Sequence, residues 1–306
     1  MKEFFLDSQY DDLRLAVALV EPECPIKGVV QLVHGMCEHK ERYYEFMQWL
    51  AAEGYACIIH DHRGHGASVK RPEDLGYMYA GGWKALVDDV KTVGDWARNA
   101  FPGAGFTLFG HSMGSLVVRS YTKRHDDSID RLFVCGSPSD NPAKGAGKLI
   151  ADAAGTLLGW HHRPKLMQAL SFGAYNKPFA GECDAAGKPY VSAWVCSNRE
   201  VLDKYHADPL CQFVFTANGF SNLMGLMKDC YSPAGWKLSN PSLPVHFISG
   251  AQDPCRISDK DFDNAVAAMR KVGYAAVSAK LYPGMRHEIL NETDRLTVWR
   301  DILSAL

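Results

Sequence analysis

The sequence has no run of about 20 apolar residues, the length that a helix needs to span a bilayer. Its 33 basic and 35 acidic side chains nearly cancel and leave a net charge of −2, so no basic field would attract nucleic acid or anionic lipid. The nine cysteines occur singly, without a C-x-x-C pair or the Cys/His spacing of a zinc site. There is no internal repeat and no low-complexity tract. We therefore expect no nucleic-acid partner and no metal.

What is present is typical of a globular protein, with 47% hydrophobic and 22% charged residues. The 306 residues suffice for one large α/β domain or two small ones. Residues 1–7 are charged too early, and their apolar stretch is too short, for a secretory signal. Together with the unpaired cysteines, which suit a reducing compartment, this predicts a cytoplasmic protein.

The most informative stretch is Gly110-His111-Ser112-Met113-Gly114, a G-x-S-x-G pattern. Residues 106–109 before it are typical of a short buried strand, and residues 115–121 after it of the opening of a helix. This is the context of a nucleophile elbow, in which small residues at both ends let strand and helix pass closely and the serine hydroxyl lies at the helix N-terminus. The pattern alone often matches by chance, but in this context it predicts that Ser112 is a nucleophile.

A serine nucleophile needs a general base and an acid that orients the base. Downstream of Ser112, the apolar strand predicted at Val245–Gly250 is followed by Asp253, and a second strand at Ala279–Tyr282 is followed by His287. Both side chains come just after strand ends, at the edge where active sites of parallel sheets collect. Each alone could be a turn or helix-start residue. Their joint order, acid and then histidine, predicts a triad with Ser112.

The remaining histidines that we considered fit the role of the base less well. Three precede the serine, and three lie in a region interpreted below as an insertion: His60, His62, His65, His161, His162 and His206. The histidine-rich segment Asp61–Gly66 is interpreted as a turn held by its own polar side chains, and not as a catalytic or metal site.

An acyl-transfer mechanism also needs two backbone N–H groups that stabilise the developing oxyanion. Met113, directly after the nucleophile, is expected to supply one. The predicted strand Gly28–Val33 runs into His34-Gly35-Met36, where Gly35 gives the turn its freedom and Met36 is placed to supply the other. An ordinary strand-end turn is the alternative interpretation of this loop.

From residue 28 onward, predicted strands and helices alternate, which is typical of a parallel sheet with crossover helices. Further strands are predicted at 56–59 and 131–135, and helices at 44–52 and 83–100. We expect Arg14–Val20 to open the sheet as part of an antiparallel edge.

About a hundred residues separate Cys135 from Val245, whereas one crossover needs about a dozen. We therefore predict a core of residues 1–137 and 234–306 and an inserted helical cap of residues 138–233 over Ser112. Two apolar runs in this cap either pack it onto the core or line a channel for an acyl chain. They are Leu149, Ile150, Ala153, Leu157, Leu158 and Trp160, and Phe213, Val214, Phe215, Phe220, Leu223, Met224, Leu226 and Met227.

Taken together, these features resemble the monoglyceride lipase and lysophospholipase branch of the α/β-hydrolases, a group also described as serine aminopeptidase-like. The resemblance covers nearly the whole chain and implies an α/β-hydrolase fold, with a mostly parallel central sheet flanked by helices. The segments that carry it are specific together and not singly. They are His34–His39 with Arg42 and Tyr43, Asp61–Gly66 with Ser68, Gly110–Gly114, Gly250–Pro254, Pro283–Glu288 and, in the cap, Asp208–Cys211.

The resemblance implies hydrolysis of a carboxylic ester through an acyl-enzyme, without a cofactor. It also implies a glycerol-sized polar pocket near Glu38, Arg42 and His111 at the end of an apolar channel. From the residues alone, Glu38 and Arg42 could equally form a surface ion pair, which contributes little to stability. Met36 departs from the pattern because it is bulkier than the small residue often found there, and this leaves the chain-length preference open.

The function favoured by the sequence is hydrolysis of monoacylglycerols or related single-chain lipid esters, with membrane contact at most transient and through the cap. One alternative is a peptidase of the proline-iminopeptidase type, which would need an acidic cluster for the substrate amine. Glu182, Asp184 and Glu200 in the cap are the candidates. Another alternative is a hydrolase-fold binding protein without catalysis, although such proteins usually lose a triad member. Hydrolysis of esters of small acids also stays open.

Overall fold

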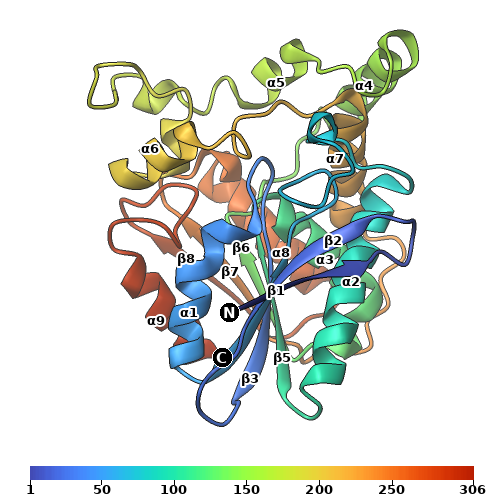
Figure 1. Cartoon of the computed structure of the whole chain (residues 1–306), viewed down its shortest axis with the longest axis vertical. Coiled ribbons are helices and arrows are strands. Elements are labelled where there is room, and N and C mark those ends of the chain that lie inside the picture. The colour runs from blue at the N-terminus through green and yellow to red at the C-terminus, as the bar shows by residue number, and fades with distance from the viewer.

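The computed structural model describes all 306 residues and contains one eight-stranded sheet with the order β1-β2-β4-β3-β5-β6-β7-β8 (Figure 1). From β4 to β8 the neighbouring strands are parallel, whereas β2 pairs antiparallel with both β1 and β4. The predicted mostly parallel sheet is therefore confirmed. The strands are β1 (Lys2–Asp7), β2 (Arg14–Val20), β3 (Gly28–Val33), β4 (Tyr55–His60), β5 (Gly105–His111), β6 (Arg131–Cys135), β7 (Val245–Gly250) and β8 (Val277–Tyr282).

The antiparallel edge differs from the prediction. Arg14–Val20 is antiparallel as expected, but it lies inside the sheet, and Lys2–Asp7 forms the edge. The edge strand has no fully buried residue, whereas six of the seven residues of β2 are buried. A strand without a buried face lacks the apolar pattern that sequence reasoning relies on, which is why it was missed.

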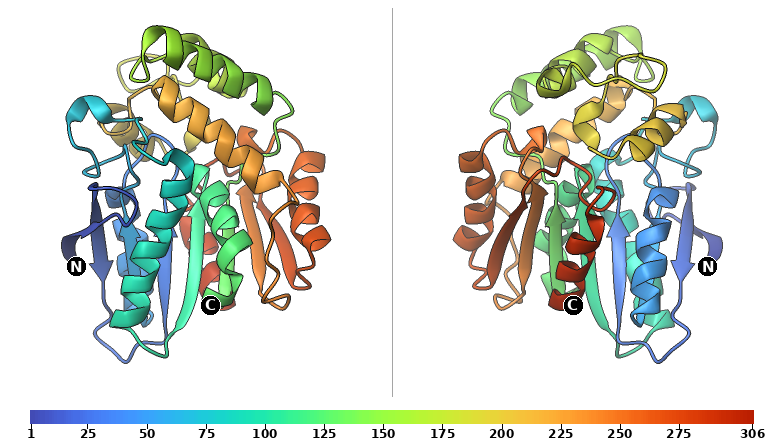
Figure 2. Two further views of the ribbon diagram at one scale, coloured as in Figure 1. Left: turned by 90° about the vertical axis from the view of Figure 1, so that its right-hand side faces the viewer. Right: turned by 90° about the vertical axis from the view of Figure 1, so that its left-hand side faces the viewer.

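Helices cover both faces of the sheet (Figure 2). On one face α2 (Gly82–Ala100), α3 (Met113–His125) and α8 (Asp259–Val272) bury their apolar sides. On the other face α1 (Tyr44–Ala52) and α9 (Arg295–Ala305) form a second core. Since the inner parallel strands are covered on both faces, their sequences are nearly continuous apolar runs, whereas the edge strand β8 is largely exposed. No helix in the structure combines the length and the apolar character required to cross a bilayer.

The segment between β6 and β7 lies over the carboxyl edge of the sheet (Figures 1 and 2). We keep the name cap for residues 138–233, which include all four helices of this segment. These are α4 (Lys144–Leu158), α5 (Lys165–Phe172), α6 (Arg199–Ala207) and α7 (Ala217–Tyr231). The last of them is tied to α3 by the Asp229 carboxylate, which accepts hydrogen bonds from both terminal nitrogens of Arg124 at 2.9 and 2.8 Å. The edge of the sheet that carries the predicted site residues is thus covered by the helices of the cap.

Candidate active site

Ser112 stands at the sharp turn between β5 and α3, as the elbow pattern predicts. Its backbone has φ +54° and ψ −120°, a strained conformation of the kind that clusters at functional sites. Neighbouring chain segments leave no room for side chains at the two glycines of the pattern. A Cβ at Gly114 would overlap the carbonyl oxygen of Val33, and one at Gly110 would lie 2.6 Å from Val118 Cγ2. The glycines therefore let strand and helix pass at this distance.

This close approach gives a stability prediction for Gly114→Ala. The added methyl group overlaps the carbonyl oxygen of Val33, so β3 must shift away from α3. We expect a loss of about 3 kcal/mol in the free energy of unfolding, together with loss of esterase activity. The control is Gly145→Ala in α4, where a Cβ meets nothing within 4 Å and stability should stay the same or rise by up to about 1 kcal/mol. The measurement is urea unfolding of both variants. Equal unfolding midpoints for Gly114→Ala and Gly145→Ala would contradict the packing argument.

Asp253 and His287, both predicted from the sequence, are brought together at the ends of β7 and β8. The His287 Nδ1 lies 2.9 Å from Asp253 Oδ2. That carboxylate also accepts hydrogen bonds from the Ser249 hydroxyl at 3.0 Å and the Cys255 N–H at 2.8 Å. Burial disfavours its charge, but the attraction of His287 and these donors prevails and lowers the pKa of Asp253. An ionised Asp253 accepts a hydrogen bond from the Nδ1–H group of His287, which leaves Nε2 as the basic nitrogen.

The histidine and the serine line one pocket, and no hydrogen bond joins Ser112 Oγ to His287 Nε2 in the structure. The partner recorded for Nε2 is the Cys255 thiol, with Sγ 4.0 Å away. Burial and the neighbouring Asp253 raise the pKa of this thiol well above its ordinary value, so it stays protonated and weakly nucleophilic. This agrees with interpreting Cys255 as a small buried side chain rather than a catalytic one.

The two backbone groups expected for the oxyanion flank the serine. Met36 follows β3, and its N–H donates no hydrogen bond within the protein. Met113 is the first residue of α3, where N–H groups have no partner inside the helix. The loop carrying Met36 closely approaches Ser112, since a Cβ at Gly35 would lie 2.9 Å from Ser112 Cβ. Both methionines line the pocket, so the geometry is compatible with the predicted oxyanion hole.

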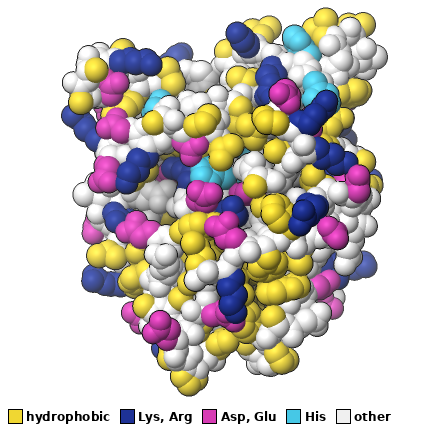
Figure 3. Space-filling view, in the orientation of Figure 1, with side chains coloured by type: hydrophobic (Ala, Val, Ile, Leu, Met, Phe, Trp, Pro, Cys, Tyr) yellow, Lys and Arg dark blue, Asp and Glu magenta, His cyan; other side chains and the backbone are white.

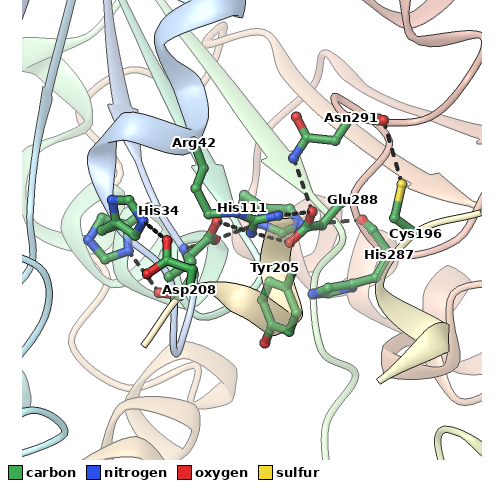
Figure 4. Close-up of polar contacts among 12 residues, drawn as sticks. His34, Arg42, His111, Cys196, Tyr205, Asp208, His287, Glu288 and Asn291 are labelled. Atoms are coloured by element: carbon green, nitrogen blue, oxygen red, sulfur yellow. Dashed lines mark hydrogen bonds and ion pairs between the residues drawn. The ribbon is translucent and has the colours of Figure 1, made fainter. Parts of the chain in front are cut away.

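Glu38, Arg42 and His111 also lie together, in a buried network rather than a surface ion pair. Figure 4 shows Arg42 and His111 in this network. The side chains of Arg42 and Glu38 are only 11% and 4% exposed. A fourth member, Glu288, was not singled out from the sequence and binds Arg42 through both carboxylate oxygens. Glu288 belongs to the Pro283–Glu288 segment and directly follows His287. Its pairing with a residue 246 positions away leaves no local signal.

The charges in this network can be assigned from its hydrogen bonds. Both ring nitrogens of His111 face acceptors, with Nδ1 3.1 Å from Glu38 Oε1 and Nε2 3.2 Å from the His287 carbonyl oxygen. A ring that donates from both nitrogens is an imidazolium. Burial opposes its charge, but the hydrogen bond and charge of Glu38 prevail and raise the pKa of His111. Burial likewise opposes ionisation of Glu38, while His111 and Arg42 lower its pKa to about 2.

A pocket of about 390 Å³ extends from Ser112 between the core and the cap. Glu38, His111 and Glu288, which hydrogen bonds and Arg42 link into one cluster, form what we call its polar end, and the 18 hydrophobic residues among the 30 that line it form its apolar wall. Part of the second apolar run predicted in the cap lines that wall: Phe213, Val214, Leu223, Met224 and Met227.

The first apolar run of the cap neither lines the pocket nor packs on the core, which corrects the prediction. Leu149 and Leu157 of α4 are 71% and 81% exposed. Their neighbours Ile150, Leu158 and Trp160 are also exposed. The apolar face of this helix points away from the protein. The sequence pattern shows that a helix has an apolar face but not whether other parts of the protein cover that face.

Two cap segments contact the loop that carries His287. Arg286 donates hydrogen bonds to both carboxylate oxygens of Glu182 and to the carbonyl oxygen of Ala193. The ring of Trp194 lies 5.0 Å from that of His287, centroid to centroid, and the Glu288 N–H donates to the Val195 carbonyl at 2.8 Å. The cap therefore contributes to positioning His287.

The acidic cluster required for a peptidase is not formed by the three cap residues proposed for it. Glu182 is bound by Arg286, Asp184 accepts hydrogen bonds from its own turn, and Glu200 pairs with Lys204 at the surface. None of the three lines the pocket. These three cap residues therefore do not form the site for a free amine that the peptidase alternative requires.

The other histidines lie outside the pocket lining. His60, His62 and His65 are buried together with His34. The Asp61 carboxylate accepts the N–H groups of Lys40 and Ala67, so this segment is a turn held by its own side chains, as interpreted from the sequence.

Two groups of side chains place possible metal-ligating atoms within 4.8 Å of one another. One contains Asp253, Cys255 and His287, whose contacts are described above. The other contains His39, Asp208 and Cys211, in which the His39 ring is hydrogen-bonded to the Asp208 carboxylate at 2.7 Å.

Comparison with known proteins agrees with this geometry. The family profile described as "Serine aminopeptidase, S33" matches residues 25–294. The chain is 32% identical to human monoglyceride lipase, with 89% of this chain and 78% of that protein covered. It is 28% identical to a monoacylglycerol lipase of Mycolicibacterium smegmatis, with 95% and 92% covered. A carboxyl esterase of Bacillus coagulans, crystallised with glycerol, has the same fold, with a TM-score of 0.89 at 22% identity and 99% and 96% coverage.

Proposed function

Since this chain belongs to the serine aminopeptidase S33 family and has the α/β-hydrolase fold, we propose that it is a serine carboxylic ester hydrolase acting on monoacylglycerols or related single-chain lipid esters. The observation that carries the proposal is the lining of the pocket, which combines Ser112 with an apolar wall and a small polar end. A monoacylglycerol has the same division, with the ester bond between an acyl chain and a glycerol. The likeness to human monoglyceride lipase over 89% of the chain supports it.

The proposed mechanism uses the triad in its ordinary roles. His287 Nε2 takes the hydroxyl proton of Ser112 as the Ser112 oxygen attacks the ester carbonyl carbon. Asp253 orients and stabilises the imidazolium that forms on His287. The N–H groups of Met36 and Met113 stabilise the oxyanion. When the tetrahedral intermediate collapses, the C–O bond to the alcohol breaks and His287 returns the proton to the leaving oxygen. Water then repeats the sequence on the acyl-enzyme and releases the fatty acid.

We propose that residues 138–233 act as a cap on the core formed by residues 1–137 and 234–306. Their part in the pocket supports this, because Phe213 and Met224 face the space next to Ser112. All nine cysteines are free thiols, which suits a reducing compartment. On that ground we propose a cytoplasmic location.

Transient contact with lipid through the cap is the next part of the proposal. Basic and acidic side chains are interspersed on the face shown in Figure 3, without a patch of one sign that would hold an anionic surface. By contrast, α4, α5 and the following loop expose a set of large apolar side chains. They are Leu149, Ile150, Leu157, Leu158, Trp160, Leu166, Leu170 and Val191. An apolar surface next to the pocket would touch the lipid from which a monoacylglycerol is drawn.

The double variant Leu149→Ser/Leu157→Ser tests this contact. Each leucine removed from a lipid interface costs about 1.5 kcal/mol or more, so hydrolysis of monooleoylglycerol in neutral vesicles should fall at least about tenfold. Hydrolysis of dissolved p-nitrophenyl butyrate should be unchanged. The control variant Leu238→Ser/Leu296→Ser removes two exposed leucines outside the cap and should affect neither assay. Equal loss on both substrates would show that the cap variant damages the enzyme rather than its docking.

The proposed function is tested by offering purified protein three substrates side by side: a long-chain monoacylglycerol, p-nitrophenyl butyrate and proline p-nitroanilide. We expect the monoacylglycerol to be hydrolysed with the highest kcat/KM and the anilide to be left intact. Turnover of the anilide alone would replace the proposal with the peptidase alternative. Turnover of p-nitrophenyl butyrate alone would restrict the enzyme to esters of small acids.

A further inference from the structure

The polar end of the pocket is where the leaving alcohol must lie, if the proposed function holds. The ester carbon is attacked by Ser112, and the acyl chain extends along the apolar wall. The leaving oxygen must then face His287, which protonates it. Glu288 follows His287 in the chain, and Glu38 contacts His111 beside the nucleophile, so both carboxylates border the space next to that oxygen. Any group attached to the alcohol therefore meets these two residues.

Apart from its histidines, the charged side chains that line the pocket are all negative. Of the 30 lining residues, none is Lys or Arg, and two are glutamates, Glu38 and Glu288. The cations that balance them are already engaged. Arg42 donates from one terminal nitrogen to both glutamates and from the other to Glu288 at 2.6 Å. Both ring nitrogens of His111 are bound to acceptors.

This arrangement determines which head groups can be accommodated. A neutral glycerol can donate its hydroxyl protons to carboxylate oxygens and bring no charge into the pocket. A phosphate attached to that glycerol would lose its hydration in a buried site where Arg42 and His111 already balance the two carboxylates, so no surplus positive charge would compensate it. It would also find no free cationic donor of the kind that holds phosphate in proteins. The pocket is thus built for an uncharged alcohol.

We infer that Glu288, together with Glu38, determines substrate class at this site: it admits esters of uncharged alcohols and rejects lysophospholipids whose phosphate adjoins the glycerol. This inference rests on the proposed function and adds a residue and a selection rule to it. Glu288 is the better residue to substitute in a test, because Arg42 is its only ionic partner. Glu38 in addition accepts the Gly35 N–H in the loop of the oxyanion hole.

The test compares kcat/KM for monooleoylglycerol and for oleoyl lysophosphatidic acid in the same neutral detergent micelles. Wild-type protein should prefer monooleoylglycerol by at least about a hundredfold. Glu288→Gln keeps the shape but removes one negative charge and leaves Arg42 incompletely neutralised. A unit charge a few ångströms away in a buried site alters binding by well over tenfold, so the ratio of phosphate-bearing to neutral turnover should rise at least about tenfold. A ratio within one variant cancels any general loss of catalysis.

The matched control is Asp229→Asn, which breaks another arginine–carboxylate pair, that of Arg124 with Asp229, away from the pocket lining. It should leave the ratio at the wild-type value. Should Glu288→Gln fail to fold, Glu38→Gln removes the other carboxylate and is expected to raise the ratio in the same direction. Comparable wild-type turnover of both lipids, or an unchanged ratio in a folded variant, would overturn the inference.

Failure of the proposed function gives a different result. In that case wild-type protein hydrolyses p-nitrophenyl butyrate and neither lipid. Head-group selection is then measured as competition, since monooleoylglycerol should inhibit p-nitrophenyl butyrate hydrolysis while the lysophosphatidic acid should inhibit only after Glu288→Gln. Equal inhibition of the wild-type enzyme by both lipids would overturn the inference here as well.

Discussion

Replacing Ser112 with alanine is expected to lower kcat for p-nitrophenyl butyrate by about 10⁵-fold. The substitution removes the oxygen that forms the acyl-enzyme but leaves the pocket and the proposed oxyanion groups, which account for the residual rate over water. Stability should not fall, because the Ser112 hydroxyl makes no hydrogen bond in the structure and its φ of +54° strains the wild-type backbone in the same way. The measurements are steady-state kinetics and a thermal melt.

The matched control for this prediction is Ser304→Ala in α9, a residue outside both the cap and the pocket lining. Its kcat should equal that of the wild type. A Ser112→Ala protein that retains more than one per cent of the wild-type kcat would assign the chemistry to another residue.

The second large effect concerns stability in acid. Four histidines, His34, His60, His62 and His65, are packed against one another in the core, with centroids 4.3 to 6.1 Å apart. Burial lowers the pKa of all four, to about 3 for His60 and about 4 for His65. In the unfolded chain they bind protons with a pKa of about 6.5. Unfolding therefore takes up protons below that pH, and stability must fall as the pH falls.

His111 acts in the opposite direction, since its pKa is raised in the folded protein. The stability that His111 contributes is fully present below a pH of about 6.5. It is lost as the pH rises through the pKa that His111 has in the folded protein. Between pH 6 and pH 5, His111 is protonated in both states, so the pH dependence comes from the four histidines with lowered pKa, which take up nearly four protons on unfolding. Each proton changes the free energy of unfolding by about 1.4 kcal/mol per pH unit, or about 5 kcal/mol in total. We expect most of the stability to be lost between pH 6 and pH 5.

Urea unfolding at pH 7.5, 6 and 5 measures this loss. His60→Leu is the informative variant, because neither ring nitrogen of His60 has a hydrogen-bond partner. Its unfolding should take up one proton fewer, and its stability should depend less steeply on pH. A free energy of unfolding that is constant from pH 7.5 to pH 5 would show that these histidines are protonated in the folded state.

The sequence predicted those parts of the fold that depend on local pattern. Gly28–Val33, Arg131–Cys135 and Val245–Gly250 were predicted with the bounds that the structure has, because strands buried on both faces are continuous apolar runs bounded by turns. Lys2–Asp7 was missed because an exposed edge strand carries no such run. The exposure of α4 was missed because an apolar helix face has the same sequence whether protein or solvent covers it.

The candidate site likewise has residues that the local sequence pattern predicts and contacts that it does not predict. Ser112, Asp253 and His287 were predictable because each lies in the short segment after a strand, and the carboxyl ends of parallel strands meet at one edge of the sheet. The pairing of Arg42 with Glu288 was not, because it joins the start of one helical segment to a loop 246 residues later. Such contacts are set by how elements pack in space, and local spacing carries no record of them.

The account rests on Ser112 as the residue that is acylated, and trapping that intermediate tests it most directly. The wild-type protein is mixed with p-nitrophenyl butyrate, quenched in acid within milliseconds, digested and examined by mass spectrometry. We predict a butyryl group on the peptide that contains Ser112, at the serine itself, and none on the same peptide of Ser112→Ala. A butyryl group on Cys255 instead, or rapid turnover without any acylated serine, would contradict the account.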